Sequence, residues 1–316
     1  MSSNMNVFIK FCEPAYHYTP YIAELWNTLS SFAYCVAAIH FVYQVNSYQK
    51  ALPECFSANL VWRFRASAFA WFVLGLGSAA FHAFQTLWAE LWDEIGMLMA
   101  ILSVSYCLFD LHPLTTSYRA NWFYGSLVLF MAAALTVYIQ IMYHPFFALC
   151  FIVSALIPAL ITLTLPMRMN NGTGLKLYKE DSGPPSRAVK ASKALILQKG
   201  FALSPFGEMG VDKLVKRGIF TAILGYAIWH IDQKCVSEGW KHNSSLAYES
   251  TWYYWSHPLW HSLTAIAVVF IFDAMLKIRI ESYISPLVRR AGTGSFIPNF
   301  SFEKSLRIFF KLNHSS

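Results

Sequence analysis

Long runs of apolar residues with few charges between them constrain this chain more than any other feature. Charged residues make up 13% of the chain and hydrophobic ones 56%, whereas ordinary soluble domains carry about 25% charged residues. A helix that crosses a bilayer needs about 20 mostly apolar residues. Seven such runs occur, at 23–45, 64–86, 90–110, 121–141, 144–165, 215–233 and 258–277. The sequence therefore predicts an all-α polytopic membrane protein, with a seven-transmembrane-helix bundle in residues 1–277, rather than a soluble helical core.

Lys and Arg residues divide unequally between the two sides of such a bundle. If the spans alternate in direction, one side carries only Lys10, Lys234 and Lys241, and the other carries the rest of the 24 Lys and Arg residues. Because the positive side of a membrane protein faces the cytosol, we expect a lumenal or extracellular N-terminus and a cytosolic C-terminus. The N-terminus has no basic and apolar segments of a cleaved signal peptide. The formal net charge of +7 needs no nucleic-acid partner.

Two segments lie outside the predicted spans and are rich in polar and basic residues. Residues 166–214 mix Gly, Pro, Ser and Lys with little periodicity, which is typical of a cytosolic loop. Residues 278–316 alternate basic and aromatic side chains, so this cytosolic tail is either solvated or rests on anionic headgroups. No second soluble domain is predicted.

The predicted topology brings ionisable side chains from several helix ends to the same lumenal depth. Ionisable residues inside a membrane are costly and usually serve a site that faces the bundle interior. The residues that meet there are Ser78 and His82 at the end of the second span, Asp93 at the start of the third, His230 and Asp232 at the end of the sixth, and His257 and His261 at the start of the seventh. We therefore expect one site near the lumenal surface.

The spacing of the histidines favours a metal. His257 and His261 are four residues apart, so both imidazoles lie on one face of a helix. With His82 they would form the three-histidine set of a catalytic zinc site, which leaves one position open. Pro258 suits the first turn of a helix, where its missing N–H costs nothing.

Each of these residues also has a structural interpretation. Single histidines in aromatic-rich bundles often serve packing, and Asp93 could cap its helix or pair with a histidine. Ser78 lies in GLGSAAF, where small residues allow helices to approach closely. If His230 or Asp232 supplied a fourth ligand, the metal site would be closed and structural, as in a seven-span receptor or scaffold.

Four sequence motifs fall at the predicted helix ends. They are YIAELWNTLS at 21–30, LGLGSAAFH followed by LWDEIGML, WHIDQKC at 229–235, and SHPLWHSLT at 256–264. In this order, along all seven predicted spans, the chain resembles the alkaline ceramidases of a wider seven-span hydrolase superfamily. The resemblance implies a zinc-dependent amidase of the endoplasmic reticulum or Golgi membrane that cuts ceramide into a sphingoid base and a fatty acid.

The resemblance also implies a role for each site residue. By position, His82, His257 and His261 would bind zinc, Asp93 would be the general base for the attacking water, and Ser78 would help hold the oxyanion. A zinc-dependent lipid esterase or phospholipase of the same superfamily would use the same groups. Only the resemblance favours an amide over an ester, and the ceramide species is not encoded in any motif.

A calcium site is a further implication of the resemblance, and here the chain departs from the pattern. The family builds this site from an acidic N-terminal motif and the Glu of the first span. Glu13 and Glu24 remain, but Lys10 and Ala15 stand where the pattern has Asp and Asn. Two carboxylates are few for an ion that takes about six to eight oxygen ligands. Our hypothesis is that the Lys10 ammonium replaces the calcium charge and pairs with both carboxylates.

Two covalent features are predicted on the lumenal side. Cys12 and Cys235 both lie there, where disulfides form, so they would either be bridged or remain two thiols. Asn243 is the one N-x-S/T site on that side and is a candidate for glycosylation. The other four cysteines fall in spans or on the cytosolic side and are expected to be thiols.

Overall fold

Every regular element that the structure describes is helical. The computed structural model describes residues 11–53, 55–111, 117–141, 146–147, 149–158, 160, 204–206, 209–242 and 254–291. Its long helices are α1 (Leu25–Ala51), α2 (Ala58–Phe84), α3 (Leu87–Leu111), α4 (Ser117–Ile141), α7 (Val211–His242) and α9 (Ser256–Ala291). Within these residues the all-α prediction is confirmed.

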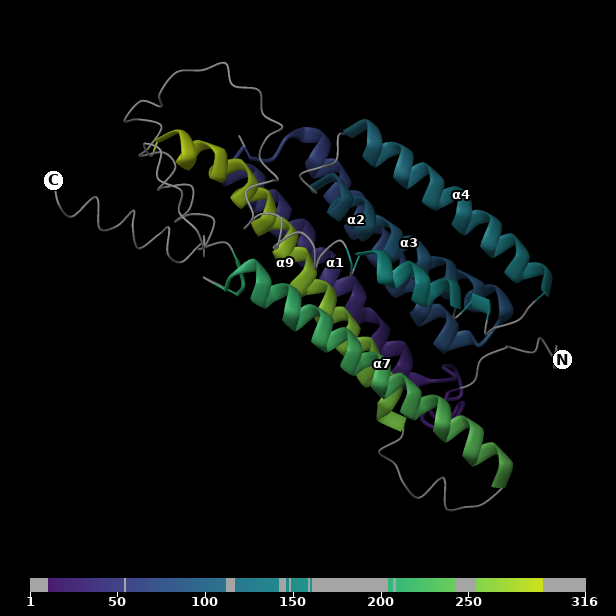
Figure 1. Ribbon diagram of the computed structural model, residues 1–316. Helices are drawn as coiled ribbons and strands as arrows, with labels where there is room; N and C mark the ends of the chain where they lie inside the picture. Colours follow the sequence, from purple (N-terminus) through teal and green to yellow (C-terminus); the bar gives the residue numbers. More distant parts are fainter. Residues whose placement is uncertain are drawn as a thin grey trace.

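The helices lie side by side as an elongated bundle (Figure 1). Helix α1 packs between α2 and α9, with α3 and then α4 following on the α2 side and α7 packing on α9. Helices α1 and α9 run parallel, since residue numbers increase in the same direction along both helices from one contact to the next. Tyr34 hydrogen-bonds Thr264 at 2.6 Å between hydroxyl oxygens, and the ring of Phe41 stacks on Phe272 at 3.8 Å. This register places the starts of both helices at the same end of the bundle.

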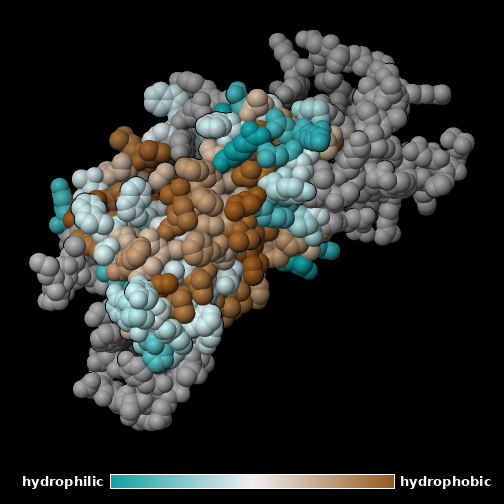
Figure 2. Space-filling model, turned by 180° about the vertical axis from the view of Figure 1, so that it is seen from behind, coloured by the Kyte–Doolittle hydropathy of each residue, from teal (hydrophilic) through white to brown (hydrophobic). Residues whose placement is uncertain are grey.

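Three of the helices are long and apolar enough to cross a membrane, namely Leu25–Ala51, Ala58–Phe84 and Leu87–Leu108. They coincide with the first three predicted spans. Shorter apolar helical stretches occupy Gly125–Gln140 and Leu149–Pro158, within the fourth and fifth. Apolar side chains cover the middle of the face drawn in Figure 2, and hydrophilic ones lie mainly toward its ends. The full count of seven spans and the sidedness of the termini remain predictions.

Helix boundaries differ from the predicted spans in the C-terminal half of the chain. Helix α7 begins at Val211 and continues to His242, beyond the apolar run at 215–233, and α9 continues to Ala291. A helix can continue beyond its apolar residues, because its backbone hydrogen bonds do not depend on side-chain polarity, whereas the sequence prediction follows the apolar residues alone. The predicted loop 166–214 therefore ends at Gly210, and its part from 166 to 203 lies outside the described residues.

Two glycines let α2 approach its neighbours closely beside Ser78. A Cβ at Gly75 would lie 2.6 Å from Sγ of Cys35 on α1, and one at Gly77 would lie 3.1 Å from the carbonyl oxygen of Trp92 on α3. The small residues around Ser78 thus serve helix packing, as their sequence suggests. Because the three helices are this close, polar side chains of α1, α2 and α3 can meet in the interior.

At the opposite end of the bundle, the segment before α7 is tied to α9. Ser204 donates a hydrogen bond to Asp273 Oδ2 at 2.9 Å, and Lys277 Nζ lies 3.3 Å from the same oxygen. Lys277 also donates to the carbonyl of Met209 at 2.9 Å, and the ring of Phe206 stacks on Phe270. This buried ion pair fixes where the chain re-enters the bundle as α7.

Candidate metal centre

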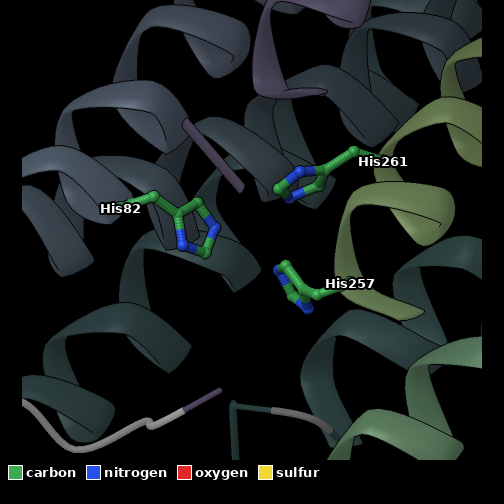
Figure 3. A group of neighbouring side chains, drawn as sticks. All are labelled: His82, His257 and His261. Atoms are coloured by element: carbon green, nitrogen blue, oxygen red, sulfur yellow. The ribbon is translucent and has the colours of Figure 1, made fainter. Parts of the chain in front are cut away.

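Three buried histidines from two helices converge at the end of the bundle where α1 and α9 begin (Figure 3). His82 comes from the last turn of α2, and His257 and His261 from the first turns of α9. One ring nitrogen from each lies within 4.8 Å of the other two, and the three side chains are at most 3% exposed. In the described part of the chain, this is the group of His, Cys, Asp and Glu side chains whose spacing could hold a metal ion.

Local structure brings His82 to this point. Helix α2 ends at Phe84 because Gln85 adopts a left-handed conformation (φ 47°), and its N–H bonds to the carbonyl of Phe81. The carbonyls of His82 and Ala83 then accept hydrogen bonds from the backbone N–H groups of Glu24 and Ala23, each at 3.0 Å. The segment before α1 is thereby fastened to the last turn of α2, beside the imidazole.

The Glu24 carboxylate orients the His82 ring. Glu24 Oε2 lies 2.6 Å from His82 Nδ1, and both side chains are buried. A carboxylate accepts from an imidazole N–H, so the proton lies on Nδ1 and the lone pair on Nε2. His82 Nε2 is buried and has no hydrogen-bond partner in the structure. Metal-binding histidines commonly have this arrangement, with a carboxylate on the other ring nitrogen.

Ser30 sets the orientation of His261 in a similar way. Its hydroxyl donates to the carbonyl of Asn27 at 3.0 Å and lies 2.8 Å from His261 Nδ1. When the hydroxyl donates to Asn27, the serine oxygen can accept from Nδ1–H. His261 Nε2 is likewise buried without a partner. For the third histidine, His257 Nδ1 is 3.6 Å from Asp232 Oδ2, beyond hydrogen-bonding distance.

These observations fit a divalent transition metal. Three neutral imidazoles are a ligand set that zinc accepts. Each of them has one buried ring nitrogen without a hydrogen-bond partner, and such nitrogens are rare unless a ligand completes them. A carboxylate and a hydroxyl hold the opposite nitrogens in place. The predicted set His82, His257 and His261 is therefore brought together.

Asp93 and Ser78 lie next to this group. Asp93 lies near the start of α3 with its side chain 9% exposed, and Ser78 lies one turn before His82 on α2. The Ser78 hydroxyl lies close enough to the Asp93 carboxylate to stabilise it. Asp93 also lies near His82. A carboxylate and a hydroxyl thus stand beside the imidazoles, as the sequence predicts.

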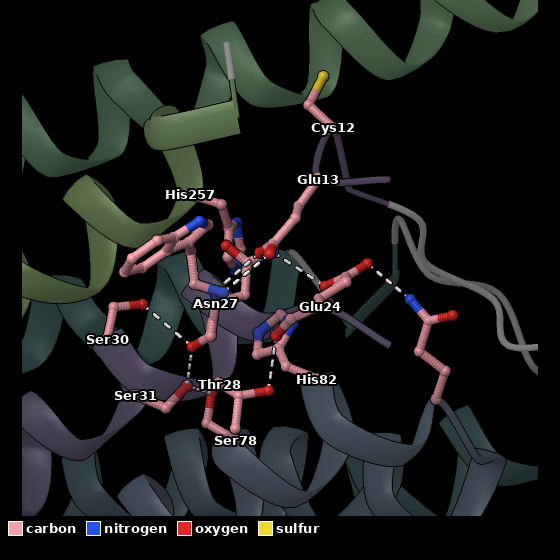
Figure 4. A network of polar contacts seen from close by, with 12 residues as sticks. Cys12, Glu13, Glu24, Asn27, Thr28, Ser30, Ser31, Ser78, His82 and His257 are labelled. Atoms are coloured by element: carbon pink, nitrogen blue, oxygen red, sulfur yellow. Dashed lines mark hydrogen bonds and ion pairs between the residues drawn. The ribbon is translucent and has the colours of Figure 1, made fainter. Parts of the chain in front are cut away.

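The other N-terminal carboxylate, Glu13, caps helix α1 (Figure 4). Its two oxygens accept the backbone N–H groups of Trp26 and Asn27, each at 2.8 Å, which are otherwise unpaired at a helix start. Burial raises the pKa of Glu13, and these two hydrogen bonds partly offset the rise. The oxygens of Glu24 accept from Asn27 Nδ2 at 2.9 Å and Gln85 Nε2 at 2.6 Å, besides His82. Both carboxylates therefore already have protein donors.

Asp232 connects the N-terminal segment to α7 and α9. Its carboxylate accepts from the backbone N–H of Cys12 and from the Ser256 hydroxyl, each at 3.2 Å. Next to Cys12, the ring of Phe11 lies 3.9 Å from that of His257. His230, in contrast, is exposed and packs on Tyr226. Asp232 is thus a neighbour of His257, and His230 stands apart from the site.

Several predicted features fall outside the described residues. They are Lys10 with its proposed pairing, the glycosylation candidate Asn243, and the side chain of Cys235. Cys12 is disulfide-bonded, and Cys35, Cys55, Cys107 and Cys150 carry no disulfide. The Cys12–Cys235 pairing stays a prediction.

The sequence interpretation missed the partners of the histidines. The sequence predicts Glu24 as a calcium ligand, and it predicts no role for Ser30 or Ser31. A usable signal was present, because Glu24, Asn27 and Ser31 recur at helical spacing in an otherwise apolar stretch. Such a polar stripe on a membrane helix points to a partner in the bundle interior.

Comparisons with known proteins agree with this geometry. The family model described as "Ceramidase" matches residues 4–286. The chain is 26% identical to alkaline ceramidase 3 of Mus musculus over 133 residues, 42% of this chain and 46% of that protein. It is 31% identical over 100 residues to the alkaline ceramidase YPC1 of Saccharomyces cerevisiae, 32% of this chain and 28% of that protein. A putative alkaline ceramidase of Dictyostelium discoideum, dcd3B, is 30% identical over 112 residues, 33% of this chain and 39% of that protein. The matches span less than half the length of each relative.

Proposed function

The chain belongs to the ceramidase family, and on that premise we propose that it hydrolyses the amide bond of ceramides with a zinc ion held by His82, His257 and His261. The products would be a sphingoid base and a fatty acid. The observation that carries this proposal is the convergence of three buried imidazoles, each with one ring nitrogen that has no hydrogen-bond partner.

The residues around the histidines suit amide hydrolysis. A bound zinc ion would polarise the amide carbonyl and lower the pKa of a water molecule to about 7. Asp93 would accept a proton from the attacking water and pass it to the leaving amine, which is general acid–base catalysis. Ser78 would turn its hydroxyl toward the carbonyl oxygen as negative charge develops there. Glu24 and Ser30 hold the imidazoles and do not contact the substrate.

A membrane lipid is the substrate that fits the position of this site. The histidines lie at the ends of helices that are long and apolar enough to cross a bilayer. Trp88, Trp92 and Trp255 are exposed near the same ends, and tryptophan is enriched at membrane interfaces. A polar headgroup could enter from water while the acyl chains stay among the helices. With the charge distribution, this supports a multi-pass membrane protein whose active site is lumenal. The endoplasmic reticulum or Golgi membrane is proposed from family membership alone.

We also propose that this chain works without calcium. The carboxylates of Glu13 and Glu24 are the expected calcium ligands, yet each oxygen already accepts a hydrogen bond from a backbone N–H, an amide or an imidazole. Glu13 serves the start of α1, and Glu24 serves His82. With these donors in place, few lone pairs remain for a cation that takes about six to eight oxygen ligands.

The proposed function is tested on the full chain purified in detergent. We expect about one zinc ion per chain by elemental analysis and release of fatty acid from ceramides but not from phospholipids. Removal of zinc by a strong chelator should abolish activity, and zinc should restore it, whereas a calcium-selective chelator should have no effect. Stoichiometric zinc with no cleavage of any ceramide would defeat the proposal, and cleavage of phospholipids alone would assign the esterase activity instead.

Replacement of Glu24 by Gln tests the orienting carboxylate. Glu24→Gln keeps the side-chain shape but removes the charge that accepts from His82 Nδ1, so zinc affinity should fall about 10- to 100-fold. Competition with a chromophoric zinc chelator measures this change. Gln85→Leu is the matched control, because it removes one donor from Glu24 without touching His82, and it should have a smaller effect. Equal zinc affinity in wild type and Glu24→Gln would contradict the orienting role.

A further inference from the structure

Ser31 on α1 lies between Ser78 on α2 and His261 on α9, and the proposed mechanism gives it no role. Its side chain is completely buried. Its hydroxyl oxygen lies 2.8 Å from the carbonyl oxygen of Asn27, 3.1 Å from Ser78 Oγ and 3.5 Å from His261 Nδ1 (Figure 4). Since Ser30 already contacts His261 Nδ1 at 2.8 Å, the short side-chain contact of Ser31 is with Ser78.

The Ser31 hydroxyl has one proton and two acceptors within reach. A bond to the carbonyl four residues earlier is a common resting place for serine in helices. The second acceptor, Ser78 Oγ, belongs to another helix and comes near only because Gly75 lets α1 and α2 approach closely. The bond to Asn27 stays within α1, whereas the contact with Ser78 joins α1 to α2 beside the proposed site.

The direction of the Ser31–Ser78 bond decides where the Ser78 proton points. When Ser31 donates to Ser78 Oγ, Ser78 cannot donate back and must direct its own proton elsewhere. The group in contact on its other side is the Asp93 carboxylate. Ser31, Ser78 and Asp93 then form a chain of hydrogen bonds with a single direction, and such chains polarise each member.

We propose that Ser31 is a positioning residue that keeps the Ser78 hydroxyl directed into the active site and strengthens it as a donor. In the resting site Ser78 donates to Asp93. During the reaction the same hydroxyl, still held by Ser31, turns to the carbonyl oxygen of the lipid. This inference rests on the proposed role of Ser78 and adds the residue that holds it in place.

A double-mutant cycle between positions 31 and 78 tests the inference. Ser31→Ala should lower kcat about tenfold, because a buried hydrogen bond between side chains is lost, while KM and zinc content stay unchanged. In a Ser78→Ala background the same change should have no further effect on kcat. Ser31→Thr keeps a hydroxyl and should recover most of the loss.

Ser47→Ala is the matched control. Ser47 also lies on α1 and donates to the carbonyl four residues earlier at 2.9 Å, but this hydrogen bond is exposed, toward the other end of the helix. Its loss should leave kcat unchanged.

The outcomes separate this inference from the proposed function. Wild-type kcat in Ser31→Ala, or an equal loss of kcat in both backgrounds, would overturn the positioning role while leaving ceramide hydrolysis in place. The cycle uses whichever amide or ester lipid the wild type cleaves, so a wild type inactive on ceramide would defeat the proposed substrate and still allow the coupling to be measured.

Discussion

A chain carrying His261→Ala is expected to lose its zinc on dialysis and at least about a thousandfold in kcat, because the metal supplies several kcal/mol of transition-state stabilisation and about 1.4 kcal/mol corresponds to a tenfold change in rate. The remaining pair, His82 and His257, would hold the ion with two ligands, too few for a catalytic zinc sphere. Elemental analysis and a fatty-acid release assay measure both effects.

His230→Ala is the control for the loss of a histidine near the same end of the bundle. His230 lies on α7 and is exposed beside Tyr226, so its replacement should leave zinc content and activity unchanged. If His261→Ala kept one zinc ion per chain, the ligand assignment would be wrong. If it lost zinc but kept its activity, the metal would be structural.

Replacement of Asp93 by Asn is expected to separate chemistry from metal binding. Asn has nearly the same shape but cannot accept a proton, so kcat should fall about 100- to 10,000-fold, the usual range for loss of a general acid–base group. Zinc content should stay at one per chain, because Asp93 lies beside Ser78 and does not belong to the group of three histidines that could hold the metal. Activity and zinc are measured on the same preparation.

Two results would contradict this role for Asp93. Loss of zinc in Asp93→Asn would make the carboxylate a metal ligand, and an unchanged kcat would place the general base elsewhere. Glu94→Gln provides a neutralising control at the next position of α3. Glu94 accepts the hydroxyl of Tyr138 on α4 at 3.0 Å and influences Asp93 through its charge, so its neutralisation should lower kcat far less than Asp93→Asn does.

The sequence was sufficient to predict the all-helical architecture, the first three apolar helices and the approach of the three histidines. Apolar runs mark α1, α2 and α3 because a bilayer-spanning helix has a characteristic length and composition. The four-residue spacing of His257 and His261 is a property of one helix and is visible without the fold. His82 could be added because alternating spans place its helix end on the same side.

The partners of these residues could not be predicted in the same way. Glu24 meets His82 only because the segment before α1 runs over the last turn of α2 and hydrogen-bonds its carbonyls, and no local pattern encodes that path. Glu13 caps a helix that begins well after it in the sequence, unlike the usual cap, which lies next to the helix start. Such contacts depend on tertiary structure.

The separation of the three histidines along the chain ties metal binding to the synthesis and packing of α9. His82 is made with α2, whereas His257 and His261 arrive with α9, the last helix that the structure describes. Until α9 packs beside α1, Glu24 orients a solitary imidazole and Ser30 has no ring to hold. A chain whose translation stops before α9, or whose α9 fails to insert, carries one of the three proposed ligands. Zinc content would therefore report whether a newly made chain has been fully inserted into the membrane.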